Sequence, residues 1–162
     1  MRNLFCLTVM LSAACSPAEQ QTAAPAAPDT TAVRAGLEAL FDRYDQAVIA
    51  GDAAGVGPLY RDDATIVVYG IPELRGRAAI EAWYVAALSM LKVPTHDIVL
   101  STVNAPAPGL TTALGTYSET VDSAGTIKDS WGRWVGSFVQ DSTGEWRIAF
   151  LMAFPDSVKA AQ

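Results

Sequence analysis

The residues best suited to binding or transforming a polar group are Asp129, Trp131 and Arg133, which alternate along one segment. The segment has the composition of a β-strand, so the three side chains share one face. With four-residue loops on either side, that face also carries the most apolar side chains of the sheet and lies against the helices. A charge on an apolar face must be paired, hydrated or at the mouth of a pocket. We therefore expect a site here, with Asp129, Arg133 and the helical Tyr44 as candidate catalytic groups.

An alternative orientation of the same strand stays open. A β-bulge at Gly132 or Gly136 would reverse which residues face inward. Trp134 and Phe138 would then point toward the helices, and Asp129 would lie in solvent. The sequence does not decide between the two orientations.

Two further ionisable residues have competing interpretations. Glu119 could serve as a general base, but the expected pairing places it across from Lys128, where a surface ion pair is the simpler interpretation. His96 is the only histidine, and its neighbour Asp97 points to the opposite face of a strand, so Asp97 cannot easily orient it. The domain has no second histidine and no cysteine, and we expect no metal site. We also find no phosphate-binding motif and expect no cofactor.

The elements that position these residues are predicted from periodicity and turn signals. An amphipathic helix begins near Thr30 or Thr31 and ends at Gly51, and a second helix ends before Pro94. Residues 64–69 are β-branched and typical of a buried strand. Short turns separate four later strands, which should pair as an antiparallel meander in an α+β domain. These strands are expected at about Thr95–Ala105, Leu110–Val121, Thr126–Gln140 and Glu145–Phe154.

The N-terminus has the features of a secretion signal, namely Arg2, a short apolar run and small residues before Cys15. The sequence before Cys15 resembles a lipoprotein box. This implies a lipidated cysteine that anchors the protein in the bacterial cell envelope, facing the periplasm. Ordinary signal cleavage, giving a soluble periplasmic or secreted protein, is the alternative. The expected boundaries are 1–15 for the signal, 16–31 for a flexible Ala/Pro linker, 32–155 for the domain and 156–162 for a tail.

The charge distribution limits the partners. The formal net charge is −6, and the basic residues are scattered without a run. We therefore expect no binding to nucleic acid through phosphate contacts. A membrane contact would come through Cys15, and a small apolar molecule would bind among the aromatic side chains.

Three motifs, in this order, resemble those of the nuclear transport factor 2-like superfamily in its SnoaL-like branch, over roughly 32–154. They are Ala-Gly-Asp at 50–52, Tyr-Arg-Asp-Asp-Ala-Thr at 60–65, and Gly132-Arg133-Trp134 followed by Gly-Glu-Trp-Arg-Ile at 144–148. The resemblance implies a cone-shaped fold, in which a strongly bent, mostly antiparallel sheet wraps around N-terminal helices. It also implies a pocket at the wide end and a homodimer through the outer sheet face.

The same superfamily includes ketosteroid isomerase, with which the chain can be compared residue by residue. Tyr44 matches the tyrosine of its oxyanion hole. The general base of that enzyme falls at Val68, and its protonated aspartic acid falls near Val135 or Gly136. Two of the three catalytic groups are therefore absent, and Tyr44 alone is more simply a pocket or core residue.

Two function classes follow. The first is a non-catalytic module that binds a small hydrophobic ligand, or assembles, near the envelope; the missing base at Val68 favours it. The second is an enzyme that transfers a proton on a small hydrophobic molecule, such as an isomerase, cyclase or dehydratase. It would use Asp129 or Glu119 as base and Tyr44 or Arg133 as electrophile. The predicted ligand-binding residues are Tyr44, Val68, Trp83, Trp131, Arg133 and Trp134.

Overall fold

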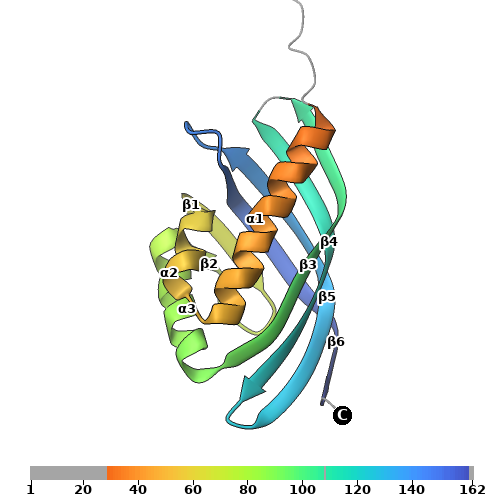
Figure 1. The fold of residues 1–162 in the computed structure, drawn as a ribbon. Coiled ribbons are helices and arrows are strands. Elements are labelled where there is room, and N and C mark those ends of the chain that lie inside the picture. The colour runs from red at the N-terminus through yellow and green to blue at the C-terminus, as the bar shows by residue number, and fades with distance from the viewer. Residues whose placement is uncertain (1–28, 108, 161–162) are drawn as a thin grey trace, which may run out of the picture.

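A computed structural model describes residues 29–107 and 109–160 (Figure 1). In these residues the chain forms three α-helices, one short 3-10 helix and a six-stranded sheet. The elements are, in chain order, α1 (Thr30–Ala50), α2 (Ala53–Val56), η1 (Gly57–Leu59), β1 (Tyr60–Val68), β2 (Leu74–Arg75), α3 (Arg77–Met90), β3 (Lys92–Ala107), β4 (Leu110–Ser123), β5 (Thr126–Gln140) and β6 (Trp146–Ala160).

The strands form one sheet in the order β2-β1-β6-β5-β4-β3. Every neighbouring pair is antiparallel except β1 and β6, which run parallel. The long strands bend strongly, and α1 lies along them while α2 and α3 lie beside β1 and β2 (Figure 1). The predicted α+β architecture, with a bent and mostly antiparallel sheet wrapped around helices, is confirmed.

Local side chains and backbone conformation set the ends of α1. The Asp29 carboxylate precedes the helix and accepts the backbone N–H of Thr31 at 2.9 Å. Asp29 is therefore the N-cap of α1, where Thr30 or Thr31 was expected. Its carboxylate also complements the positive N-terminus of the helix. Thr30 and Thr31 belong to the helix and not to the expected linker. After Ala50, Gly51 has a φ of 70°, in the left-handed region that glycine adopts at low cost.

The turn between β4 and β5 is tighter than expected. Ser123 pairs with Thr126, so Ala124 and Gly125 alone form the turn. Both residues have positive φ, at 51° and 85°, as a favoured two-residue hairpin turn requires.

This tighter turn removes the expected ion pair between Glu119 and Lys128. Glu119 pairs with Ser130, whereas Lys128 pairs with Val121 and is exposed. Because the register moves by an even number of residues, each side chain keeps its expected face relative to β4.

The β5–β6 hairpin has a different register, which reverses the expected orientation of β5. Gln140 pairs with Trp146, one residue later than expected, because residues 141–145 form the loop. Asp141 closes this loop by accepting two of its backbone N–H groups, at 2.9 and 3.1 Å. A shift by a single residue exchanges the two faces of a strand relative to its partner.

Strand β5 therefore follows the alternative orientation. Trp134 and Phe138 are buried and point inward, whereas Val135 and Ser137 between them are on the outer face. Two bulges accompany this orientation, and both extra residues lie in β6. One is Asp156, opposite the expected position Gly132, because Gly132 pairs with Pro155 and Trp131 with Ser157. Phe138 pairs with Ile148 and Ser137 with Phe150, which leaves Ala149 as the other extra residue.

The last strand is also longer than expected. It continues past Phe154 to Ala160, because residues 157–160 pair with residues 128–131 of β5. Residues 156–160 are thus part of the sheet and not a tail.

Candidate active site

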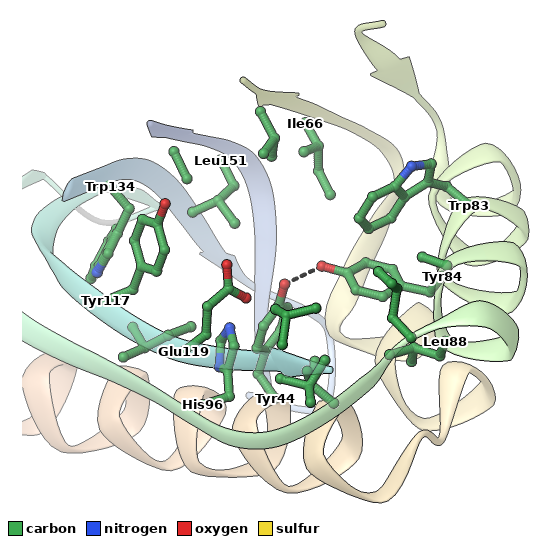
Figure 2. Close-up of a pocket in the computed structure, with 18 residues that line it drawn as sticks. Tyr44, Ile66, Trp83, Tyr84, Leu88, His96, Tyr117, Glu119, Trp134 and Leu151 are labelled. Atoms are coloured by element: carbon green, nitrogen blue, oxygen red, sulfur yellow. Dashed lines mark hydrogen bonds between the residues drawn. The ribbon is translucent and has the colours of Figure 1, made fainter. Parts of the chain in front are cut away.

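A cavity of about 240 Å³ lies between α1, α3 and the inner face of the sheet (Figure 2). Most of its wall is aliphatic or aromatic, and both the helices and the sheet contribute side chains to it. The polar groups in the wall are tyrosine hydroxyls, one imidazole and one carboxylate. An apolar wall with a few converging polar groups is typical of a small-molecule site. Representative apolar residues are Val48 from α1, Leu88 from α3, Ile66 from β1 and Leu151 from β6.

His96 projects from β3 into the cavity, and Asp45 of α1 orients its ring. Nδ1 of His96 lies 2.7 Å from Oδ1 of Asp45, and the two side chains are 10% and 15% exposed. Oδ2 of the same carboxylate accepts the backbone N–H of Ile98 at 3.1 Å. Because an ionised carboxylate only accepts hydrogen bonds, Nδ1 carries the proton and Nε2 keeps a lone pair in the neutral ring. A histidine held in this way can act as a general base.

Tyr44 and Tyr84 form a second polar group at the junction of α1 and α3. Their hydroxyls hydrogen bond to each other in the cavity (Figure 2). The ring of Tyr60 packs edge-on against Tyr44, with ring centroids 6.4 Å apart. Burial raises the pKa of all three phenols well above the ordinary value, and the neighbouring phenols add to this effect. The phenols are therefore neutral near pH 7, and the Tyr44–Tyr84 pair can donate one hydrogen bond to a ligand.

Glu119 is the carboxylate in the wall. It lies beside His96, its partner across β3 and β4, and points into the cavity (Figure 2). It forms no hydrogen bond or ion pair with any residue that the structure describes. Its negative charge contributes to the raised pKa of Tyr44, Tyr84 and Tyr117, although burial is the main cause for each.

The predicted ligand-binding residues divide between the two faces of the sheet. Four of the six lie in the cavity, whereas Trp131 and Arg133 of β5 do not line it. Those in the cavity wall are Tyr44, Val68, Trp83 and Trp134.

The charged candidates of β5 lie on the outer face, and their expected place in the cavity was wrong. Arg133 is 61% exposed and binds Asp156, with Nη2 2.7 Å from Oδ1. Its guanidinium carbon lies 5.4 Å from the centre of the Phe154 ring. Asp129 accepts a hydrogen bond from the Thr120 hydroxyl at 2.8 Å. The changed register of the β5–β6 hairpin explains both placements.

Sequence reasoning missed Asp45 and considered only Asp97 as a partner for His96. One signal was present, because Asp45 lies at helical spacing from the buried Phe41 and Val48, at the border of the apolar stripe of α1. The crossing of α1 over β3 could not be predicted in the same way. It joins residues 51 positions apart in the chain.

Two negative findings apply to residues 29–107 and 109–160. No cluster of three or more His, Cys, Asp or Glu side chains there could hold a metal ion. No helix among these residues has the length and hydrophobicity needed to cross a membrane.

The bent sheet and the helices against it have the nuclear transport factor 2-like fold, with an apolar cavity between the two layers. The chain belongs to the SnoaL-like domain family, whose model matches residues 29–151. No curated protein matches the chain.

Several solved structures share the fold at low sequence identity. A ketosteroid isomerase-like protein from Erwinia carotovora atroseptica is 18% identical with a TM-score of 0.68, over 76% of this chain and 95% of that one. A candidate scytalone dehydratase from Novosphingobium aromaticivorans is 9% identical with a TM-score of 0.71, over 82% and 90%. LinA is 16% identical with a TM-score of 0.68, over 82% and 91%. At these identities the likeness establishes the fold and not the reaction.

The raised pKa values of the buried tyrosines predict a loss of stability in alkaline solution. In the unfolded chain a tyrosine titrates near pH 10, whereas the folded protein keeps these protons to higher pH. The unfolded state therefore binds fewer protons above about pH 10, and the free energy of unfolding falls as the pH rises further. Urea denaturation between about pH 8 and about pH 11 measures this fall.

The variant Tyr60→Phe tests the assignment of this effect. It removes one of the shifted groups, so its stability should fall less steeply with pH than that of the wild type. The exposed Tyr69, replaced by phenylalanine in the same way, is the control and should leave the slope unchanged. Equal slopes in all three proteins would contradict the assignment.

Proposed function

We propose that this protein is an enzyme that transfers a proton on a small, largely apolar molecule bound in the cavity. The carrying observation is the His96–Asp45 pair, which opens onto an apolar cavity beside the neutral Tyr44–Tyr84 pair. A base and a hydrogen-bond donor therefore face one small volume, as proton abstraction next to a carbonyl group requires. The SnoaL-like domain and the isomerase-like and dehydratase-named structural neighbours are compatible with this class.

The reaction would begin when Nε2 of His96 takes a proton from a carbon next to a carbonyl group. The C–H electron pair becomes a C=C bond, and the carbonyl oxygen becomes an enolate oxygen. The Tyr44–Tyr84 pair would donate a hydrogen bond to that oxygen. In a ketone with a C=C bond next to the deprotonated carbon, return of the proton to the far carbon of that bond shifts the double bond and completes an isomerisation. Alternatively, the enolate expels a hydroxyl group, which takes the proton from His96 and leaves as water, completing a dehydration.

Charge stabilisation would come from the two carboxylates next to the ring. Once it has taken a proton, the His96 imidazolium lies against Asp45 on one side and beside Glu119 on the other. The Asp45 carboxylate, 2.7 Å from Nδ1, would form a charge-assisted hydrogen bond with the protonated ring. Two carboxylates, Glu119 and Asp129, are candidate bases from the sequence. Glu119 lies in the wall of the cavity and Asp129 does not.

Binding without catalysis is the second candidate function. Val68 lies in the cavity wall where the general base of ketosteroid isomerase would be expected from the sequence comparison. A pure binding module would use the apolar wall alone, and its ligand affinity would not depend on the tautomer of His96. The two candidates therefore differ in what substitution of His96 does.

The proposed reaction can be tested with the ketone β-tetralone in heavy water, by following exchange of its acidic C–H protons with NMR. We expect the wild type to accelerate exchange and His96→Gln to lose about 100-fold or more of this acceleration, because the base is gone. Asp45→Asn should also slow exchange strongly, since an amide no longer fixes the tautomer. Asp97→Asn is the matched control, because Asp97 is exposed next to His96.

Either of two results would reject catalysis by this pair. One is binding of β-tetralone with no acceleration by the wild type, which supports the binding module. The other is equal acceleration in the wild type and in His96→Gln. Near-ultraviolet circular dichroism of each variant shows whether the fold is retained.

We also propose that the protein is lipidated at Cys15 and anchored in the bacterial cell envelope facing the periplasm; the support is the signal sequence, which lies outside the described residues. Expression in a bacterium fed labelled palmitate should label the wild type and not Cys15→Ser. Labelling of both proteins, or of neither, would contradict lipidation at this residue. A soluble, cleaved product is the expected result under the alternative.

The outer sheet face supports a further proposal, a homodimer. Sedimentation of the wild type should give a dimer, and Val135→Glu should give a monomer because it buries a charge in the interface. Val85→Glu on the exposed face of α3 is the control. A monomeric wild type would contradict the proposal. The large apolar side chains exposed on the outer face are Val99, Leu114, Ile127, Trp131, Val135 and Phe154.

A further inference from the structure

The charges around the cavity are unbalanced. The described residues of its wall include the carboxylate of Glu119 and neither a lysine nor an arginine. A second carboxylate, Asp45, lies directly behind His96. If the imidazole is protonated, it compensates one of these two carboxylates; if it is neutral, it compensates neither. The polar end of the cavity is therefore negative in both protonation states.

No lysine or arginine among the described residues forms an ion pair that removes this excess charge. Glu119 has no ion pair among the described residues, and Lys128, the cation expected opposite it, pairs with Val121 and is exposed. The tyrosines around it stay neutral because burial raises their pKa. Both oxygens of Asp45 are occupied, one by His96 and the other by the Ile98 N–H. Glu119 is thus the carboxylate left to meet a ligand.

The surroundings of Glu119 would also favour a cation. Tyr117 lies two positions before it on the same face of β4, and Trp134 and Tyr44 line the same cavity. The indole of Trp134 is fixed, since its Nε1 donates to the carbonyl oxygen of Thr116 at 3.1 Å. Aromatic faces attract ammonium groups, and a carboxylate among them adds a direct charge pair. An anionic ligand would meet like-charge repulsion at the same place.

We propose that the cavity selects its ligand by charge, and that it takes a small apolar amine in its protonated form, with the ammonium group paired to Glu119. The hydrocarbon body would lie against the aliphatic wall formed by Ile66, Val68 and Leu151. This inference rests on the proposal that the cavity is the substrate site. It does not depend on the proposed proton transfer.

The test compares three ligands that share one hydrocarbon body and differ in charge: cyclohexylmethylammonium, cyclohexylmethanol and cyclohexanecarboxylate. Isothermal titration calorimetry with the wild type at pH 7 should give the tightest binding for the ammonium ion and the weakest for the carboxylate. A charge-assisted hydrogen bond corresponds to roughly 10- to 100-fold between the ammonium ion and the alcohol.

The variant Glu119→Gln keeps the shape of the side chain and removes the charge. It should remove the preference for the ammonium ion and leave binding of the alcohol within about threefold of the wild type. Glu38→Gln, on the exposed face of α1, is the control and should behave as the wild type. Equal binding of all three ligands to the wild type, or a preference that survives in Glu119→Gln, would overturn the proposal.

This outcome is separable from the outcome of the exchange experiment. Ammonium selection without any proton exchange would support the charge-selective cavity and reject the enzyme. Proton exchange together with a preference for the neutral or anionic ligand would reject charge selection and leave the enzyme standing.

Discussion

The packing of α1 against the bent sheet is the constraint on which the remaining structure depends. Phe41 of α1 lies against Trp134 and Phe138 of β5, with ring centroids 4.8 and 5.6 Å apart. These aromatic rings fill the space between the helix and the middle of the sheet. A side chain at Gly115 would come within 2.9 Å of the Trp134 ring and 1.8 Å of a backbone oxygen of β3, so the glycine permits this approach. The core is thereby closed around the middle of α1, and the cavity lies beyond it, toward α3.

The chemistry of the cavity follows from the same packing. Because α1 crosses β3 next to the aromatic cluster, Asp45 reaches His96, and Tyr44 reaches Tyr84 of α3. Two hydrogen bonds therefore link α1 to β3 and to α3, three of the elements that line the cavity. Burial raises the pKa of the phenols and keeps them neutral, and the Asp45 carboxylate accepts hydrogen bonds from His96 and from the Ile98 N–H. Among the described residues, the cavity thus brings together an oriented imidazole, a neutral hydrogen-bond donor and one carboxylate without an ion pair, within an apolar wall.

The sequence predicted the fold well because its signals are local. The apolar stripe of α1, the glycine after it and the short turns determine the elements and their antiparallel pairing. The orientation of β5 could not be predicted, since it depends on whether Gln140 pairs with Glu145 or with Trp146 across the hairpin loop. That single-residue difference moves Asp129 and Arg133 to the outer face and Trp134 to the inner one. The His96–Asp45 pair could not be predicted either, because it requires the relative placement of a helix and a strand.

The most direct test of the proposed base is the tautomer of His96, read from its ring nitrogen shifts by NMR. The chain has a single histidine, so the two signals need no assignment among residues. In the neutral ring we expect Nδ1 to carry the proton and Nε2 to carry the lone pair, with this preference lost in Asp45→Asn. A ring protonated at Nε2, or an even mixture of tautomers in the wild type, would contradict the account. In that case no lone pair would be held ready at the cavity.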